Sequence, residues 1–287
     1  MRLGTRGSAL ALAQATPVAE RLGAELVTIS SEGDRSAAPL AEIGGTGVFA
    51  SALREALLAG EVDAVVHSLK DLPTAPYPGL ALGAVPKRAD ARDGLCARDG
   101  LTLQTLPEGA RVGTGSPRRA AQLRQARPDL EVVDIRGNVD TRLGRVGVDL
   151  DAVVLALAGL DRLGRAAAVT QELTWPTAPG QGALAIEVRT GDERSVAKLD
   201  DKPSRMTVAA ERKVLGLLEA GCTAPVGAQA LLDDGLLFLS ASVYRTDGTE
   251  RITASHALYP EDSDDPAEEL AQRVSAELLE LGAGALL

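Results

Sequence analysis

Short apolar runs alternate with helical patterns along the first 186 residues of the chain. Runs rich in Val, Ile and Leu are typical of strands, and apolar residues three or four positions apart are typical of helices. The first group of expected elements is a strand at 2–5, a helix at 9–22, a strand at 25–30, a helix at 48–59 and a strand at 62–66. A second group repeats that order, with a strand at 111–114, a helix at 117–126, a strand at 131–135, a helix at 139–145 and a strand at 152–157. Such alternation predicts parallel sheets covered by helices.

The two groups also resemble each other in sequence. "RLGT" at Arg2 matches "RVGT" at Arg111, and "DAVVHSLKDL" at Asp63 matches "DAVVLALAGL" at Asp151. Short Val, Ala and Leu strings recur by chance in α/β proteins, but these matches fall at the same step of one strand–helix order. We therefore expect two similarly built α/β domains that face a cleft.

The last hundred residues have a different pattern. A helix is expected at 206–220, followed by strands that turn at Asp234-Gly235 and Asp247-Gly248, which are hairpin signals. A final helix should begin with Asp265 as its N-cap and Pro266 as its first residue. The pattern predicts a small α+β domain with an antiparallel sheet.

Composition narrows the class of protein. The 287 residues are 45% hydrophobic but only 2% aromatic, so the cores should consist of Ala, Val and Leu. The net charge of −10 argues against a nucleic-acid binder. Two cysteines make no disulfide framework, which favours a reducing cytoplasm, and no apolar run is long enough to predict a membrane span. Two histidines without zinc-type spacing predict no metal site.

The matched strand ends differ in chemistry. Ser68, Lys70 and Asp71 occupy positions that hold alanine and glycine in the second domain. The carboxyl ends of strands are where open α/β sheets bind ligands. Taken alone, Lys70 and Asp71 would be an ordinary solvated pair. Beside a cationic site, the carboxylate would instead stabilise a positive charge formed during a reaction.

Arginines gather at the same expected rim. Ser116 is a good N-cap, yet Arg118 and Arg119 follow it in the first turn of a helix, where the helix dipole disfavours cations. The side chains could simply point into solvent. The recurrence of arginine after other strands favours bidentate clamps for a ligand with several acidic groups; the further members are Arg6, Arg136, Arg142 and Arg162.

With these residues in view, the chain resembles the porphobilinogen deaminase family, also called hydroxymethylbilane synthases. The resemblance covers nearly the whole length and rests on "RLGTRGSALALAQA", "AVVHSLKDLPT", "GTGSPRRAAQL", "IRGNVDTRL", "PGQGAL" and "EAGCTAPVGA". It implies an α/β fold of two periplasmic-binding-protein-like lobes of mainly parallel sheet plus a smaller C-terminal α+β domain. The expected domains are 1–86 with 184–202, then 87–183, then 203–287.

The resemblance also implies a chemistry. Four porphobilinogen molecules lose ammonia and join into hydroxymethylbilane on a dipyrromethane cofactor, which is held by a thioether to Cys222. From its surroundings alone, Cys222 is a loop cysteine without a special role. Asp71 matches the catalytic carboxylate. By likeness, the remaining contacts fall to two groups: cofactor-binding Ser68, Lys70, Thr114, Ser116, Arg118, Arg119 and Arg136, and substrate-binding Arg2, Arg6, Gln14, Arg142, Arg162 and Gln181.

Three positions depart from the family pattern: Thr46, Gly115 and Ala220. None of them carries an assigned chemical role. The expected partner is porphobilinogen alone, without nucleic acid, membrane or an obligatory protein partner. The alternative is a non-catalytic two-lobe binding protein for a polyanionic small molecule, which would leave Asp71 and Cys222 without a function.

Overall fold

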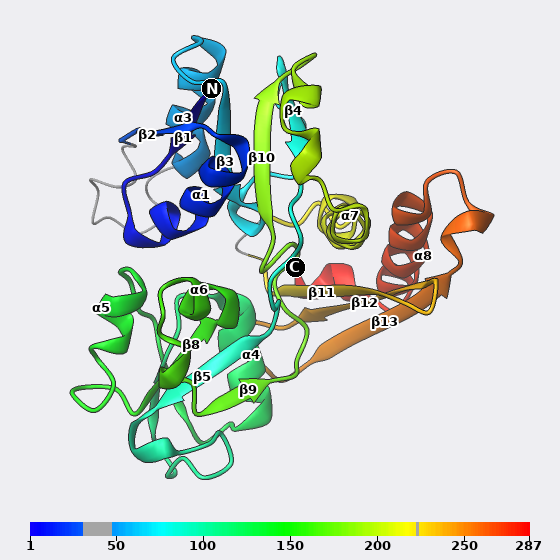
Figure 1. Ribbon diagram of the computed structural model, residues 1–287. Coiled ribbons are helices and arrows are strands. Elements are labelled where there is room, and N and C mark those ends of the chain that lie inside the picture. The colour runs from blue at the N-terminus through cyan, green and yellow to red at the C-terminus, as the bar shows by residue number, and fades with distance from the viewer. Residues whose placement is uncertain (31–47, 222–223) are drawn as a thin grey trace. The chain divides into compact units, whose positions relative to one another are not determined.

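The computed structural model of the protein describes residues 1–30, 48–221 and 224–287 (Figure 1). The chain forms two compact units. Unit 1 contains Met1–Ala89 and Gly182–Arg205, and unit 2 contains Asp90–Gln181 and Met206–Leu287. Each unit has its own sheet structure and its own apolar core.

Unit 1 is built on a five-stranded sheet with the order β2-β1-β3-β10-β4. The strands are β1 (Arg2–Thr5), β2 (Glu25–Thr28), β3 (Ala64–Ser68), β4 (Leu80–Ala84) and β10 (Leu184–Arg189). β1 pairs in parallel with β2 and β3, whereas β10 runs antiparallel to β3 and β4. The helices are α1 (Ala9–Leu22) and α3 (Val48–Leu58). Helix α1 begins where the Ser8 side chain accepts a hydrogen bond from the N–H of Ala11, and it ends at left-handed Gly23.

The first part of unit 2 repeats this topology in the order β7-β6-β8-β5-β9. β6 pairs in parallel with β7 and β8, and β5 runs antiparallel to β8 and β9. The strands are β5 (Asp93–Ala97), β6 (Arg111–Gly113), β7 (Glu131–Val133), β8 (Ala152–Ala156) and β9 (Gln171–Leu173). The helices are α4 (Pro117–Ala126), α5 (Val139–Leu143) and α6 (Leu157–Arg162). The two sheets correspond strand for strand, as the repeated sequences predict.

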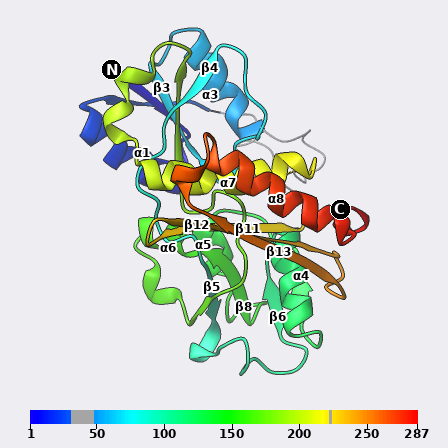
Figure 2. The same cartoon turned by 90° about the vertical axis from the view of Figure 1, so that its right-hand side faces the viewer.

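The remainder of unit 2 is a three-stranded antiparallel sheet, β11-β12-β13. Its strands are β11 (Val226–Asp233), β12 (Leu236–Tyr244) and β13 (Arg251–Leu258). Asp234 and Gly235 both have positive φ, which suits the tight turn between β11 and β12. Residues of α7 (Lys202–Leu217) and α8 (Pro266–Glu280) pack on one face of this sheet (Figures 1 and 2).

The buried residues are mainly Ala, Val and Leu, as the scarcity of aromatic residues predicts. Leu3, Leu53 and Leu57 are among the largest fully buried side chains of unit 1, and Leu95, Leu123 and Leu160 among those of unit 2.

The predicted fold class is confirmed. The expectation of mainly parallel sheet needs one refinement, because each five-stranded sheet has two parallel and two antiparallel pairings. The antiparallel pairings come from β10 in unit 1 and β5 in unit 2. The division into three domains stays a proposal, since the structure groups the second sheet and the C-terminal sheet in one unit.

Candidate active site

The carboxyl end of β3 carries a group of polar side chains. Ser68 is the last residue of the strand, and Lys70 and Asp71 lie in the single 3-10 turn, Leu69–Asp71, that follows it. The N–H of Leu69 donates to the carbonyl of Ala183 at 3.0 Å, which fixes the start of the turn. Leu69 is buried, Lys70 is half-buried and Asp71 is exposed. The turn therefore presents the Asp71 carboxylate on the surface of unit 1, at the carboxyl edge of its parallel strands.

Gln14 of α1 reaches the same strand end. Its Nε2 donates to Ser68 Oγ at 2.8 Å, and the Ser68 hydroxyl lies 3.1 Å from Gln14 Oε1, to which it donates in the alternative arrangement. Arg6 directly follows β1, the parallel neighbour of β3, and its side chain is half-buried. The structure thus brings Arg6, Gln14, Ser68, Lys70 and Asp71 to one edge of the sheet.

A buried ion cluster supports this strand end. Arg54 of α3 binds Glu187 of β10 with two hydrogen bonds, of 2.9 Å from Nε and 2.7 Å from a terminal nitrogen. His67 Nε2 lies 3.0 Å from Glu187 Oε2. Burial alone would raise the pKa of the Glu187 carboxyl, but the contacts with His67 and Arg54 outweigh it and lower that pKa to about 2. His67, next to Ser68 in the chain, therefore supports the strand end through Glu187.

Arg2 lies at the other edge of this sheet. Its guanidinium donates to the carbonyl of Gly60 at 2.7 Å, and its backbone N–H donates to Asp63 at 2.7 Å. Both partners precede β3, so this contact forms at the amino edge of the parallel strands, opposite Ser68 and Asp71. In this geometry Arg2 joins β1 to the chain before β3, and the substrate contact expected of it by likeness to the family stays a prediction.

In unit 2, helix α4 begins as the sequence predicts. The Ser116 hydroxyl accepts a hydrogen bond from the N–H of Arg119 at 3.4 Å, and the Thr114 hydroxyl accepts one from the N–H of Ser116 at 3.2 Å. A Cβ on Gly115 would lie 2.6 Å from the carbonyl oxygen of Ile135, so glycine fits this position closely. The oxygens of Thr114 and Ser116 thus hold the turn that introduces the two arginines.

Those arginines share a buried carboxylate, Asp93, which the sequence reasoning missed. Arg118 Nη1 donates to Asp93 Oδ2 at 3.0 Å, and Arg119 donates to Asp93 Oδ1 from Nη2 at 2.6 Å and from Nε at 3.1 Å. Asp93 is 0% exposed, Arg118 2% and Arg119 6%. Burial alone would raise the pKa of Asp93, but the two guanidinium groups hold it far below its usual range. The available sequence signal was an acidic residue that begins a short apolar strand.

Gln181 and Trp175 complete the surroundings of Asp93. Gln181 Nε2 donates to Asp93 Oδ1 at 2.8 Å and to the carbonyl of Ala91 at 2.6 Å, while Trp175 Nε1 donates to Asp93 Oδ2 at 3.1 Å. Gln181 is 0% exposed. Gln181 thus contacts Asp93 inside unit 2, and its contact with substrate stays a prediction. Arg118 is bound to Asp93 in the same way, and its contact with a cofactor stays a prediction.

Further arginines follow β7 and β8. Arg136 is exposed, and half-buried Arg142 donates from Nε to the carbonyl of Gly137 at 2.8 Å. Burial lowers the pKa of Arg142, and the positive charges of Arg119 and Arg136 lower it further. Arg162 ends α6, and burial lowers its pKa also. The positive charges of Arg119 and Arg136 therefore act on Arg142.

Two residues singled out by the sequence, Cys222 and Thr46, lie outside the described residues. The segment that contains Cys222 follows α7 and precedes β11. The N–H of Ala224, two residues after Cys222 in the chain, donates to the carbonyl of Gly221 at 2.9 Å.

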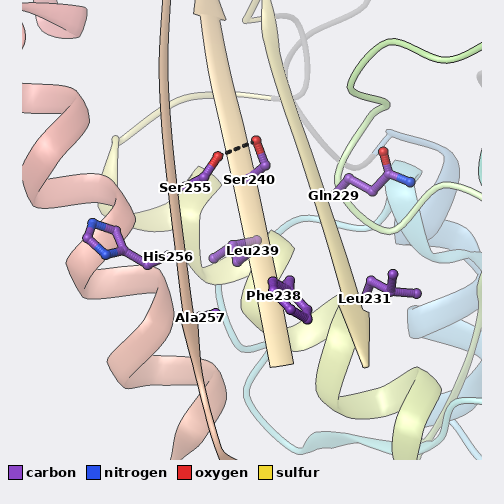
Figure 3. A pocket seen from close by; sticks show the side chains of 8 residues that line it. All are labelled: Gln229, Leu231, Phe238, Leu239, Ser240, Ser255, His256 and Ala257. Atoms are coloured by element: carbon purple, nitrogen blue, oxygen red, sulfur yellow. Dashed lines mark hydrogen bonds between the residues drawn. The ribbon is translucent and has the colours of Figure 1, made fainter. Parts of the chain in front are cut away.

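Other surfaces carry no predicted site residue. A shallow hollow lies over the three-stranded sheet, where Leu231 and Phe238 are cross-strand neighbours and Ser255 donates to Ser240 at 2.8 Å (Figure 3). Among residues 1–30, 48–221 and 224–287, no group of three or more His, Cys, Asp or Glu side chains is placed to hold a metal ion. The helices within these same residues are all too short or too polar to span a bilayer.

The sequence matches two protein-family models and is similar to several bacterial proteins. The model of the dipyrromethane cofactor-binding domain of porphobilinogen deaminase matches residues 1–197, and the model of the C-terminal domain of porphobilinogen deaminase matches residues 205–280. The porphobilinogen deaminase of Leifsonia xyli subsp. xyli is 60% identical over 308 residues, covering 100% of this chain and 94% of the relative. That of Mycobacterium tuberculosis is 52% identical over 308 residues, covering 100% and 98%.

Solved structures to which the chain is similar include an ancestral cationic amino acid solute binding protein, at 15% identity and a TM-score of 0.42, over 69% of this chain and 87% of that one. A periplasmic binding protein of Salmonella typhimurium matches at 15% identity and a TM-score of 0.39, over 71% of this chain and 93% of that one. The family models and the near full-length relatives give one answer: the chain belongs to the porphobilinogen deaminase family.

Proposed function

We propose that this chain catalyses the reaction of its family. It joins four porphobilinogen molecules head to tail into hydroxymethylbilane, with release of ammonia, on a dipyrromethane held by Cys222. At each addition the aminomethyl C–N bond of porphobilinogen breaks, ammonia leaves, and a C–C bond forms to the terminal pyrrole ring of the growing chain, which loses a proton. The observation that carries the proposal is an exposed carboxylate, Asp71, in unit 1 together with an excess of arginines in unit 2.

The residues of unit 2 fit an acidic pyrrole cofactor. Dipyrromethane carries acetate and propionate groups, and when bound it supplies the ring to which the first porphobilinogen is joined. Burial lowers the pKa of Arg142 and the charges of Arg119 and Arg136 lower it further, so a carboxylate bound beside Arg142 relieves that repulsion. Arg136 is exposed and available for such a contact. The hydroxyls of Thr114 and Ser116 hold the α4 turn and keep O–H donors for the same groups.

Asp71 supplies the negative charge that the reaction needs. Departure of ammonia leaves positive charge on the methylene carbon and the pyrrole ring of the substrate. A carboxylate that accepts a hydrogen bond from the pyrrole N–H stabilises this charge. The rigid support of the 3-10 turn by Leu69, and of the strand end by Gln14 and Ser68, keeps Asp71 oriented. Lys70 and Arg6 bring positive charge to the same edge and bind substrate carboxylates.

The proposal includes a cytoplasmic location and activity without a protein partner, nucleic acid or membrane. The scarcity of cysteine supports the location, and the net charge of −10 disfavours nucleic acid. A binding protein for a polyanion would use the arginines in the same way, but it would have no use for Asp71 or for a cysteine that carries a cofactor.

The experiment is to measure ammonia and tetrapyrrole formed from porphobilinogen by the parent protein, by Asp71→Asn and by the control Glu61→Gln. Glu61 is an exposed carboxylate of unit 1 at the amino edge of β3. We expect turnover by the parent and the control, and a fall of kcat by about 100- to 1,000-fold in Asp71→Asn, the usual effect of removing a preorganised electrostatic contact. The melting temperature of Asp71→Asn should match that of the parent. Binding of porphobilinogen without ammonia release by the parent would favour the binding protein.

A further inference from the structure

Gly227 lies near the start of β11, where the C-terminal sheet contacts the rest of unit 2. A Cβ on this residue would lie 2.8 Å from the Pro176 Cβ and 3.0 Å from the Pro176 carbonyl oxygen, inside the 3.4–4 Å of ordinary van der Waals contact. The N–H of Ala228 donates to the carbonyl of Thr177 at 2.9 Å, so β11 and the segment after β9 lie backbone against backbone. Gly227 does not have a positive φ, so space and not backbone conformation requires a glycine here.

Pro176 also receives two side chains of α4. Its carbonyl oxygen accepts hydrogen bonds from Arg118 Nη1 at 2.9 Å and from Gln122 Nε2 at 2.8 Å. Both side chains are buried. This oxygen is the same atom that a Cβ on Gly227 would approach to 3.0 Å. A side chain on Gly227 would therefore press on the acceptor that holds α4, and its absence lets both contacts form at one residue.

Helix α4 contacts the sheet at a second point, the turn between β12 and β13. A Cβ on Gly248 would lie 2.9 Å from a backbone carbonyl oxygen of α4, and Arg124 Nη1 donates to the carbonyl of Thr246 at 2.7 Å. Gly227 pairs with Ser242 of β12, so both contacts belong to the same end of the sheet. Because α4 is held at Gly248 as well, it cannot simply move away together with Pro176. A side chain on Gly227 must instead change the spacing between β11 and α4.

This spacing separates the two parts of the chain that the proposed function assigns to the cofactor. Cys222 lies five residues before Gly227, and five residues of chain span at most about 18 Å even when fully extended. A group on Cys222 is thus tethered to the start of β11. The arginines expected to bind its carboxylates belong to α4 and to the segments after β7 and β8, in the first part of unit 2. The position of β11 against Pro176 therefore sets whether the anchor and these arginines can be reached at once.

We infer that Gly227 is a positioning residue for the dipyrromethane: by letting β11 lie directly on Pro176, it sets the spacing between the anchor of the cofactor and the arginines that receive its carboxylates. The inference rests on the proposed function, which supplies the cofactor and its anchor. Gly227 acts through the position of β11 and does not itself contact the cofactor.

The test compares Gly227→Ala and Gly227→Val with the parent. Intact mass gives the fraction of purified protein that carries dipyrromethane, and kinetics with porphobilinogen give KM and the kcat per cofactor-carrying molecule. Gly227→Val should lower that fraction about twofold or more and lower kcat about 10- to 100-fold, because a displacement of about 1 Å misaligns a reacting group. KM should stay within about twofold of the parent, since Arg6 and Lys70, which are expected to bind the incoming substrate, belong to unit 1. Gly227→Ala should show smaller changes of the same kind, and it serves as the test if Gly227→Val does not fold.

Two controls separate this role from general destabilisation. Gln229→Val places the same side chain two residues along β11 on the same face, at an exposed position, and it should behave as the parent. Val274→Ala opens space in α8, where Val274 is 0% exposed beneath the same sheet, and it should lower the melting temperature without changing kcat per cofactor-carrying molecule. An equal loss of kcat in Val274→Ala, or parental kcat and cofactor content in the Gly227 variants that fold, would overturn the inference.

Trp175 provides a readout that needs no cofactor. It is the single tryptophan of the chain, it directly precedes Pro176, and it donates to Asp93 at 3.1 Å. Its emission maximum should shift in Gly227→Val and stay unchanged in Gln229→Val. The same emission in the parent and in both variants would also overturn the inference.

The parent protein separates this inference from the proposed function. A parent that carries no dipyrromethane and releases no ammonia would refute the proposed function, and with it the role of Gly227 toward the cofactor. With a parent that carries the cofactor and turns over porphobilinogen, the proposed function stands and the Gly227 variants alone decide the inference.

Discussion

Replacement of Glu187 by Gln should locally destabilise the sheet of unit 1. Glu187 lies on β10, with its side chain 6% exposed, and it binds Arg54 through two hydrogen bonds and lies 3.0 Å from His67. Gln has nearly the same shape, so the change removes charge with little change in packing. Arg54 would then be left buried without its counterion.

The size of the destabilisation follows from the pKa of Glu187. Burial acts to raise this pKa, but the contacts with His67 and Arg54 lower it from 4.5 to about 2. The folded and unfolded pKa values differ by about 2.5 units, and each pKa unit is worth about 1.36 kcal/mol. The charge of Glu187 therefore contributes about 3 kcal/mol to the free energy of unfolding at neutral pH. Removal of one partner from a buried ion pair gives a similar figure, about 3–5 kcal/mol. Because the folded pKa is depressed, this stability is fully present above about pH 4.5 and is lost as the pH falls through about 2.

Hydrogen–deuterium exchange followed by mass spectrometry measures this effect locally. In peptides that cover 64–68 and 184–189, the amides of Glu187→Gln should exchange about 300-fold faster than those of the parent at neutral pH, whereas peptides that cover 226–233 should not change. The ratio of the two rates should shrink at about pH 3.5, after correction for intrinsic exchange. Glu172→Gln, which removes an exposed partner of Arg92, is the control. A ratio below about 10 at neutral pH, or one that does not shrink in acid, would refute the reasoning.

Three further predictions follow from single contacts. Tyr244 is 1% exposed, and Tyr244→Phe removes the hydroxyl that accepts a hydrogen bond from Gln122. The free energy of unfolding, measured by urea denaturation followed by Trp175 emission, should fall by about 1–3 kcal/mol. A change below about 0.5 kcal/mol would contradict this. Arg2→Met should leave kcat/KM within about twofold of the parent, because Arg2 lies at the amino edge of the sheet; a loss above tenfold would restore its predicted role. Burial raises the pKa of the Cys96 thiol to about 11, so iodoacetamide at about pH 8 should leave it unlabelled until the protein unfolds; rapid labelling of the native protein would show otherwise.

The sequence predicted local structure well where local patterns determine it. The helix at Pro117–Ala126 and the N-cap Asp265 appear as expected, since capping residues and periodicity lie within one turn of each other. The strand expected at 62–66 is observed two residues later, at Ala64–Ser68, because pairing with β1 sets its register. The strand β10 was missed because its partners β3 and β4 lie about a hundred residues earlier in the chain.

The candidate site shows the same division. Residue type and position made Asp71 and the paired arginines candidates, because polar groups at strand ends and cations in a first helical turn are unusual in sequence. Sequence could not show that Arg118 and Arg119 share Asp93, which lies 25 and 26 residues away along the chain. Nor could it show that the Arg2 guanidinium would bind Gly60 at the opposite edge. Such pairings depend on which elements the tertiary fold brings together.

The most direct measurement of the central claim is the intact mass of the purified, denatured protein, followed by peptide mapping of any added mass. The account predicts that active protein carries one dipyrromethane and that the addition maps to the peptide containing Cys222, with Cys96 unmodified. Full turnover of porphobilinogen by protein without an addition on Cys222 would contradict it.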